Sequence, residues 1–245
     1  MKILYLALIS LFIISCSKQY HLADVETRNY RIEKASFPVD VAMAAIIEPY
    51  KLKLDETMNE VISYNEVDMI KGKPSSNLTN WFTDVLLDAS QKLVSDPVDF
   101  AIQNYGGIRL PGIPKGDITI GKVYELMPFD NIIYIMELKG ATVQALFDKM
   151  AESGGWPVSK NVYFEIAYGK AKNIKIKGVS LDSDKTYNVA IPDYIANGGD
   201  NITFLKGSKA HHTGALIRDM IIQHLKEEKL AGRTIMPSSE KRIIE

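Results

Sequence analysis

Three short loops carry residues whose types and spacing suit ligand binding. The first covers residues 104–109 and reads Asn-Tyr-Gly-Gly-Ile-Arg. Adjacent glycines let backbone N–H groups approach a ligand and allow positive φ angles, so Gly106 and Gly107 are candidates for backbone contacts. Arg109 offers five planar donors that suit phosphate or ribose oxygens, and the amide of Asn104 can donate to and accept from a base edge. Taken alone, this segment could equally be a glycine turn with a surface arginine.

Two further loops carry aromatic side chains. Residues 127–131 read Met-Pro-Phe-Asp-Asn and come just before a predicted strand, so the ring of Phe129 can lie at the edge of a cleft, although such a ring is more often a core residue. Residues 191–200 follow another predicted strand and read Ile-Pro-Asp-Tyr-Ile-Ala-Asn-Gly-Gly-Asp. Here Tyr194 offers a ring face, and the carboxylate of Asp200 can accept two protons from a sugar diol.

Two aromatic rings on separate loops, a carboxylate, an arginine and an asparagine have the composition of a nucleoside clamp. Flat bases stack on aromatic faces with about 1–3 kcal/mol for each base, and polar groups then fix the orientation of the ligand. The candidate substrate-binding residues are Asn104, Gly106, Gly107, Arg109, Phe129, Tyr194, Gly198, Gly199 and Asp200.

Helices and strands that alternate irregularly must position these loops. From Asp40 onward, apolar residues recur every three to four positions, which predicts a helix that Pro49 kinks or splits. A second helix with one apolar face begins after Ser75 or Ser76. The other patterns predict helices over 141–151 and 214–230 and strands over 98–102, 132–138, 161–168, 174–176 and 187–191. No repeat or linker divides this order, so it predicts one α+β domain.

The charge balance argues against a nucleic-acid partner. The chain has 245 residues, with 29 lysines and arginines against 30 aspartates and glutamates. A broad nucleic-acid surface would need a cationic excess to displace counterions. We therefore expect no nucleic-acid partner.

The first residues resemble a bacterial lipoprotein signal. Lys2 precedes an apolar run over residues 3–14, which is shorter than the roughly 20 residues that a membrane-spanning helix needs. The run ends in Ser-Cys, so Cys16 is the candidate lipidation site, although an ordinary signal peptide or a buried strand would give a similar run. Residues 1–16 are then a signal peptide with a lipobox, 17–30 a polar tether, and 31–245 the folded domain. This predicts a lipid-anchored protein of the bacterial cell envelope, facing the periplasm or the surface, with the lipid as its only membrane contact.

The order and intervals of the three loops are similar to those of the C-terminal, substrate-binding domain of 5′-nucleotidases. That family includes ecto-5′-nucleotidase and the bacterial UDP-sugar hydrolases. The shared motifs are Asn-x-Gly-Gly-Ile-Arg, Met-Pro-Phe and Asn-Gly-Gly-Asp, and the segment 77–84 resembles the family's Gly-Asn-Leu-x-x-Asp helix start. The likeness runs from about residue 40 to the end of the chain. It implies mixed β-sheets flanked by helices.

The resemblance also implies a role for each loop residue. Phe129 and Tyr194 would sandwich the base, Asn104 would bond its edge, Asp200 would bind the ribose hydroxyls, and Arg109 would face the ribose or the phosphate. The ligand would be a nucleoside, a nucleotide or a nucleotide sugar.

This sequence departs from the family pattern at some positions. Tyr105 stands where Gly or Ser is usual, and Asp130 stands where Gly is common. Residues 71–75 read Lys-Gly-Lys-Pro-Ser and lack the Arg and Glu that usually precede the helix. A second arginine on the phosphate side is therefore missing, which makes nucleoside recognition a firmer expectation than tight phosphate recognition.

The sequence offers no catalytic centre. Full-length family members carry an N-terminal metallophosphatase domain with two metal ions, and none of its motifs (Asp-x-His, Gly-Asp-x-x-Asp, Gly-Asn-His-Glu/Asp, Gly-His-x-His) is present. His211 and His212 are adjacent, but no cysteine or nearby carboxylate completes a metal site, and Cys16 is the only cysteine. We expect no catalytic residue, no metal ligand and no cofactor in this chain, with divalent metals only in a partner phosphatase.

Three functions remain open at this point. The chain could be the substrate-binding half of a split 5′-nucleotidase that acts in nucleotide catabolism with a separately encoded metallophosphatase. It could instead be a free-standing lipoprotein that binds nucleosides or nucleotides, or a structural domain that binds nothing. A neighbouring gene for a metallophosphatase without its own C-terminal domain would favour the first.

Lipidation of Cys16 is testable by fractionation. We expect the wild-type protein in the membrane fraction and the Cys16→Ala variant either soluble or unprocessed, because the thiol is the group that the lipid would modify. Identical fractionation of the two proteins would refute the lipobox interpretation.

Overall fold

The computed structural model describes residues 26–29 and 39–245. The predicted signal peptide, Cys16 and most of the predicted tether lie outside these residues. The chain divides into two compact units, Met1–Ile47 and Glu48–Glu245. Residues 26–29 are exposed and have no regular secondary structure. Among the described residues, no helix combines the length and the apolar composition that crossing a bilayer would require.

Helix α2 (Val41–Met58) begins where the sequence predicts, but Pro49 does not split it. The side chain of Asp40 caps the helix by accepting from the backbone N–H groups of Ala42 and Met43 at 3.0 and 3.1 Å. The helix continues through Pro49, whose nitrogen has no hydrogen to donate. None of its side chains is buried in the described structure, so the apolar periodicity does not mark a core-facing stripe.

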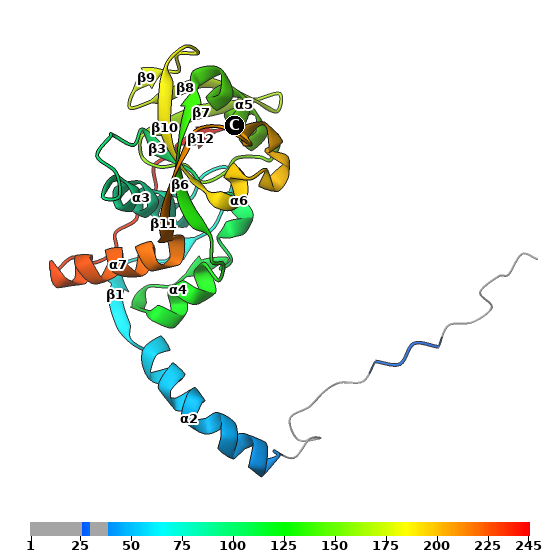
Figure 1. The fold of residues 1–245 in the computed structure, drawn as a ribbon, viewed down its shortest axis with the longest axis vertical. Coiled ribbons are helices and arrows are strands. Elements are labelled where there is room, and N and C mark those ends of the chain that lie inside the picture. The colour runs from blue at the N-terminus through cyan, green and yellow to red at the C-terminus, as the bar shows by residue number, and fades with distance from the viewer. Residues whose placement is uncertain (1–25, 30–38) are drawn as a thin grey trace, which may run out of the picture. The chain divides into compact units, whose positions relative to one another are not determined.

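The centre of the second unit is a mixed four-stranded sheet. Its strands, in spatial order, are β11 (Ala210–Leu216), β6 (Ile132–Lys139), β10 (Thr186–Pro192) and β3 (Phe100–Ala101). Strand β10 runs antiparallel to β6 and parallel to β3, and β11 runs antiparallel to β6. The resemblance implied mixed sheets flanked by helices in an α+β fold, and the structure confirms it (Figure 1).

Strands β6 and β10, in the middle of this sheet, pack against a separate core on each face. Along β6, Ile133 and Ile135 point into the first core, whereas Met136 and Leu138 point into the second. Strand β10 alternates in the same way, with Ala190 in the first core and its two neighbours in the second. Alternation with a period of two is the direct consequence of the pleat.

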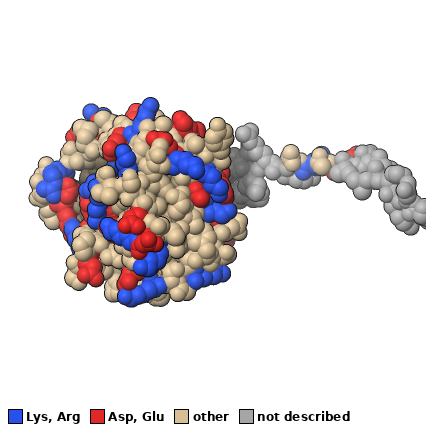
Figure 2. Space-filling view, turned by 90° about the horizontal axis from the view of Figure 1, so that it is seen from above, with Lys and Arg blue, Asp and Glu red and all other residues tan. Residues whose placement is uncertain are grey.

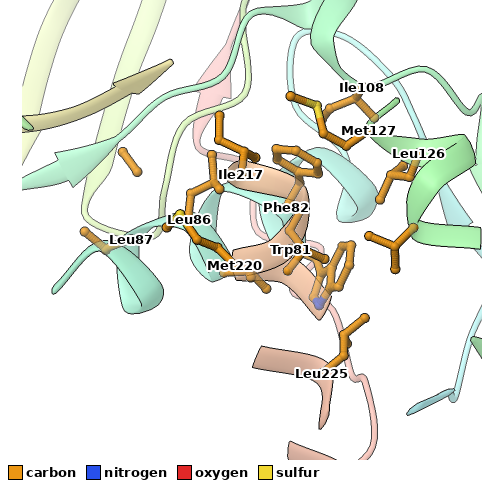
Figure 3. Packing of buried hydrophobic residues seen from close by; sticks show 14 of the residues in the cluster. Trp81, Phe82, Leu86, Leu87, Ile108, Leu126, Met127, Ile217, Met220 and Leu225 are labelled. Carbon is orange, nitrogen blue, oxygen red and sulfur yellow. The ribbon is translucent and has the colours of Figure 1, made fainter. Parts of the chain in front are cut away.

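The first core lies between the sheet and three helices, α3 (Asn77–Gln91), α4 (Ile120–Leu126) and α7 (Ile217–Leu230). In Figure 3, Trp81 and Phe82 of α3 lie among side chains from α4 and α7. The predicted cap of α3 is present as a capping box, in which Ser76 accepts from the N–H of Thr79 and the Thr79 hydroxyl accepts from the N–H of Ser76. Two short antiparallel pairs complete this side; they are β1 (Val61–Asn65) with β5 (Gly116–Thr119) and β2 (Met69–Ile70) with β4 (Gly112–Ile113).

The second core lies between the other face of the sheet and α5 (Gly140–Glu152). A second four-stranded sheet closes it, in the order β12 (Ile243–Ile244), β7 (Val162–Ala167), β8 (Lys170–Ile176) and β9 (Val179–Ser180). Phe147 is at its centre, with ring centroids 5.6 Å from Phe100 and 5.0 Å from Phe164. Aromatic pairs at these separations add to the stability that area burial provides.

Three predicted boundaries are wrong. The strand predicted over 174–176 begins at Lys170. The helix predicted from residue 214 begins at Ile217, because residues 210–216 pair with β6 as the edge strand β11. Ala215 and Leu216 fit a helical and a strand period equally well, and pairing with the sheet decides between the two. The strand predicted over 98–102 is limited to Phe100–Ala101, which pairs with Val189 and Ala190 of β10.

Charges of both signs are mixed on the surface. Figure 2 shows lysines and arginines interspersed with aspartates and glutamates on the face seen from above. Many are paired, for example Lys170 with Glu152 at 3.3 Å and Lys177 with Asp99 at 2.9 Å. Exposed pairs of this kind contribute little to stability but keep the local charge balanced.

A buried arginine near the C-terminus connects the two cores. Arg242 donates to both carboxylate oxygens of Asp84 at 2.8 and 2.7 Å and to the carbonyl oxygen of Val158 at 2.9 Å. On the same helix as Asp84, the Asn80 amide donates to the carbonyl oxygens of Ser238 and Glu240 at 3.1 and 2.8 Å. Asn80 and Asp84 of the segment 77–84 therefore bind the C-terminal segment of this domain.

We expect Arg242→Met to lower the free energy of unfolding by about 2–4 kcal/mol. The variant keeps a similar volume but leaves the partly buried Asp84 carboxylate without its cation. Arg233→Met is the matched control, because Arg233 forms a similar two-point pair with Glu228 but is exposed, and little change is expected there. Urea unfolding of the three proteins is the measurement, and equal stabilities for both variants would contradict the role of Arg242.

Candidate functional site

The three loops identified in the sequence meet at one edge of the central sheet. Strands β3 and β10 are parallel, so the loops that follow them leave from the same edge. Strand β6 is antiparallel to β10, and Pro192 at the end of β10 pairs with Ile133 at the start of β6. The loop that precedes β6 therefore arrives at this edge as well. The strand directions alone bring residues 104–109, 127–131 and 193–200 together.

These loops enclose a pocket of about 620 Å³. All the predicted site residues except Gly198 and Gly199 line it, together with two polar residues that were not predicted. The lining residues are Asn104, Gly106, Gly107, Arg109, Phe129, Asp130, Asn131, Tyr194 and Asp200. Phe129 is 40% exposed and Tyr194 is 47% exposed, so neither ring is a core residue. An exposed aromatic ring in a pocket with convergent polar groups is the usual composition of a small-molecule site.

A chain of hydrogen bonds orients the polar groups of the pocket. The Gln103 amide donates to Asn104 Oδ1 at 3.0 Å, and Asn104 Nδ2 donates to Asp200 Oδ2 at 3.0 Å. The Tyr194 hydroxyl donates to the other carboxylate oxygen of Asp200, also at 3.0 Å. Each carboxylate oxygen keeps further acceptor capacity, since a carboxylate accepts about four hydrogen bonds. Asp200 is therefore fixed in place and still able to accept from a ligand.

The backbone of the third loop is turned so that Asp200 faces Tyr194. Helix α6 (Asp193–Ala196) ends after one turn, and Asp200 and Asn201 follow with φ angles of 49° and 62°. Asp and Asn enter this left-handed region more easily than other residues with a Cβ atom. The backbone N–H of Asp200 also donates to the Tyr194 hydroxyl at 3.3 Å, which ties the turn to the ring.

Two of the glycines make room for side chains of this protein. A Cβ atom on Gly107 would lie 1.9 Å from the Gln103 amide nitrogen, and one on Gly199 would lie 2.5–2.6 Å from the ring of Tyr194. Any larger residue would displace the support of Asn104 in the first case and the aromatic ring in the second. The sequence marked both glycines as candidate ligand-binding residues, which stays a prediction; the structure adds that each makes room for a side chain of the pocket region.

Sequence reasoning missed the residues that position the two aromatic loops. The amide of Asn131 donates to Asp193 Oδ1 at 2.7 Å, and the same oxygen accepts from the backbone N–H of Tyr194 at 2.7 Å. One carboxylate oxygen thus connects the loop of Phe129 to that of Tyr194. In the sequence, Asn131 and Asp193 lie next to the two aromatic residues, and this position was the signal that could have identified them. Only the pairing of β6 with β10 shows that the two residues meet.

Arg218, at the start of α7, holds the loop of Phe129 in place through contacts with its backbone and with Asp130. It donates to the carbonyl oxygen of Phe129 at 3.3 Å and to the Asp130 carboxylate at 2.7 Å, and it lies 4.3 Å from the ring centroid of Tyr124. Burial disfavours its charged form, but the hydrogen bond to Asp130 and the charge of the neighbouring acidic groups raise the pKa of Arg218 overall. The guanidinium is therefore a permanent cation beneath the loop.

Arg109 lies at the exposed side of the pocket. Its guanidinium donates to the carbonyl oxygen of Gly106 at 3.3 Å and lies 5.7 Å from the ring centroid of Phe129. This arrangement keeps the cation beside one of the two aromatic rings with donors available to an anionic ligand.

The histidines form no metal site in the described part of the chain. Within residues 26–29 and 39–245, no group of three or more His, Cys, Asp or Glu side chains could hold a metal ion. His212 is stacked on Tyr134 instead, with ring centroids 4.0 Å apart and planes at 7°.

Comparison with known proteins places this chain in a family. Residues 61–207 match the 5′-nucleotidase, C-terminal domain family, over more than half of the chain. A 5′-nucleotidase precursor from Thermus thermophilus has a similar fold, with a TM-score of 0.70 and 29% identity, over 86% of this chain and 44% of that one.

Curated relatives agree with this assignment. The trifunctional nucleotide phosphoesterase protein YfkN of Bacillus subtilis is 28% identical over 81% of this chain and 15% of its own length. A 5′-nucleotidase of Vibrio vulnificus is 27% identical over 77% of this chain and 34% of its own length. This chain spans less than half the length of each of these proteins. It belongs to the family of 5′-nucleotidase C-terminal domains.

Proposed function

We propose that this chain binds nucleosides and nucleotides and serves as the substrate-binding part of a 5′-nucleotidase whose metallophosphatase is a separate chain. One observation is the main support for the proposed binding of nucleosides and nucleotides. Two exposed rings on different loops, Phe129 and Tyr194, line a single pocket with the polar side chains of Asn104 and Asp200. A pocket of that composition matches a ligand with one flat aromatic part and one polyhydroxylated part.

In the proposed complex, the base lies between Phe129 and Tyr194. Asn104 bonds the base edge with its remaining N–H and lone pair, and Asp200 accepts from the ribose diol. The hydrogen bonds among Gln103, Asn104, Asp200 and Tyr194 support this role, because they hold the polar groups in place without a ligand. A site that is ordered in advance loses less entropy when it binds.

The catalytic half of the proposal rests on the length and names of the relatives. The relatives named as nucleotidases or phosphoesterases are more than twice as long as the part that this chain matches. Two-metal hydrolysis needs a cluster of metal ligands, and the described residues contain none. We propose that a partner phosphatase supplies the metals and that a lipid on Cys16 anchors the binding domain at the bacterial cell envelope.

We expect Phe129→Ala and Tyr194→Ala each to weaken adenosine binding by about 1–3 kcal/mol, or roughly ten- to a hundredfold, because each removes a stacking face. Calorimetric titration with adenosine, AMP and a nucleotide sugar is the measurement. Tyr50→Ala is the control for loss of an aromatic side chain, since Tyr50 is exposed on α2 and does not line the pocket. If Phe129→Ala and Tyr194→Ala both bind adenosine as tightly as the wild type and Tyr50→Ala do, the proposed stacking of the base between the two rings is wrong.

Asp200→Asn should weaken binding of ribonucleosides more than binding of 2′,3′-dideoxyadenosine, because the lost acceptors matter only where a diol donates to them. Asn is the chosen replacement because it tolerates the positive φ at this position. Tyr194→Phe keeps the ring but removes the hydroxyl that fixes Asp200, so it should affect the diol preference more than the stacking. Equal losses for both ligands in Asp200→Asn would argue against a sugar contact.

The 245-residue chain alone should release no phosphate from nucleoside monophosphates at enzyme-like rates. The physical reason is that the described residues hold no metal-ligand cluster to activate water. Phosphate release is measured with and without Mn²⁺ or Mg²⁺, and again after addition of a candidate metallophosphatase. Metal-dependent release by the chain alone that a chelator abolishes would overturn the split arrangement.

A further inference from the structure

Asp130 lines the pocket, and the proposed complex gives it no contact with the ligand. It directly follows Phe129, and its side chain is 80% exposed. Arg218, whose side chain is only 9% exposed, donates to Asp130 Oδ1 at 2.7 Å. Among the described residues, no side chain or backbone N–H donates to the other carboxylate oxygen. The carboxylate is therefore held from the protein side and keeps acceptor capacity for a ligand.

The loop that carries Asp130 is held at both neighbouring residues. The carbonyl oxygen of Phe129 accepts from Arg218 at 3.3 Å, and the amide of Asn131 donates to Asp193 Oδ1 at 2.7 Å. One supported turn thus presents the ring of Phe129 and the carboxylate of Asp130 to the same pocket. A base that stacks on this ring has the carboxylate of the next residue beside it.

The position of the sugar in the proposed complex decides which edge of the base is left for Asp130. Asn104 is hydrogen-bonded to Asp200 at 3.0 Å, so the base edge that Asn104 meets is the one next to the ribose. The opposite edge of a purine carries N1 and the substituents at C2 and C6. Asp130 is the second carboxylate of the pocket and comes from a different loop than Asn104 and Asp200. The edge opposite the ribose is therefore the one that remains for it.

A carboxylate at this edge discriminates between bases, because it accepts hydrogen bonds and donates none. Guanine presents two adjacent donors there, N1–H and the 2-amino group, which match the two oxygens of a carboxylate. Hypoxanthine lacks the amino group. Adenine has a lone pair at N1 beside its single amino donor, and this lone pair would face a carboxylate oxygen. Of the three purines, guanine is the one that uses both oxygens.

We propose that Asp130 selects the base and that the preferred ligands are guanine nucleosides and nucleotides. This inference rests on the proposed nucleoside-binding function and names the base. Both donors of guanine can be accepted while Arg218 keeps its hydrogen bond, because each carboxylate oxygen accepts about two. Arg218 is then a positioning residue, which acts through Asp130 and the backbone of Phe129.

The experiment titrates GMP, IMP and AMP calorimetrically into the wild-type chain and its variants. These ligands share the ribose and the phosphate, so differences between them report on the base. Wild type should bind GMP about three- to tenfold more tightly than IMP or AMP, since a hydrogen bond to an exposed carboxylate is weaker than one to a buried carboxylate. Asp130→Asn should lose this preference and favour AMP, because the new amide donates to N1 and accepts from the amino group of adenine.

Asp88→Asn is the matched control for the loss of one negative charge and one ion pair. Asp88 is also an exposed carboxylate, paired with Lys160 at 2.9 Å, and it does not line this pocket. Its variant should bind the three ligands as the wild type does. Circular dichroism checks that each variant is folded, and Asp130→Ala, which also removes both acceptors, replaces Asp130→Asn if that variant does not fold.

The outcomes distinguish this inference from the proposed function. Wild type that binds GMP, IMP and AMP equally would overturn selection by Asp130 and leave nucleotide binding standing. A preference for GMP that survives without the carboxylate would also overturn the inference. So would an equal loss for all three ligands in the Asp130 variants, because that result would show a role in loop support alone. No binding of any of the three ligands by folded wild type would overturn both proposals.

Discussion

Strands β6 and β10 of the central sheet pack against a separate core on each face, and the rest of the domain depends on this constraint. Ile133 and Ile135 of β6 must face the helices of the first core while Met136 and Leu138 face the second. A shift of one residue in register would exchange the two sets and leave each core with side chains shaped for the other. The register between β6 and β10 is therefore fixed by packing on two sides, and so is the edge at which their loops meet.

The pairing of the strands brings the loops of the site to the same edge of the sheet, and polar contacts then fix the positions of these loops. Strand direction delivers the two aromatic loops to the same place, and hydrogen bonds from Asn131 to Asp193 and from Arg218 to the Phe129 loop then set their positions. Apolar packing would bury Phe129 and Tyr194 and so remove the faces that a ligand needs. Polar supports hold the loops while leaving both rings partly exposed, as the proposed stacking of a base between them would require.

Sequence alone predicted much of the fold and most of the pocket, for identifiable reasons. The loop of Phe129 precedes a strand with a strong local pattern, and the loop of Tyr194 follows another. The motifs in these loops resemble those of a known family, and this resemblance predicted the fold. Three features needed tertiary information. The local pattern of residues 214–216 fits a helix as well as a strand, and pairing with β6 makes these residues part of strand β11. Arg218 and Arg242 are charged residues that local pattern assigns to the surface, yet both are buried by partners far away in the sequence. Whether Cys16 carries a lipid stays a prediction from the sequence.

In the proposed complex, Tyr194 would serve both the stability of the loop and the recognition of the ligand. A phenylalanine would give the same stacking face, but the tyrosine hydroxyl binds both the carboxylate and the backbone N–H of Asp200. It thereby holds Asp200 in a left-handed backbone conformation that has an energetic cost of its own. Since Asn104 occupies the other carboxylate oxygen, the carboxylate cannot rotate freely, and its remaining lone pairs point in fixed directions. An acceptor fixed in this way favours two neighbouring hydroxyl groups over one, because only a diol can use both oxygens without disturbing the network. Selectivity for a sugar would then follow from bonds that the protein makes to itself.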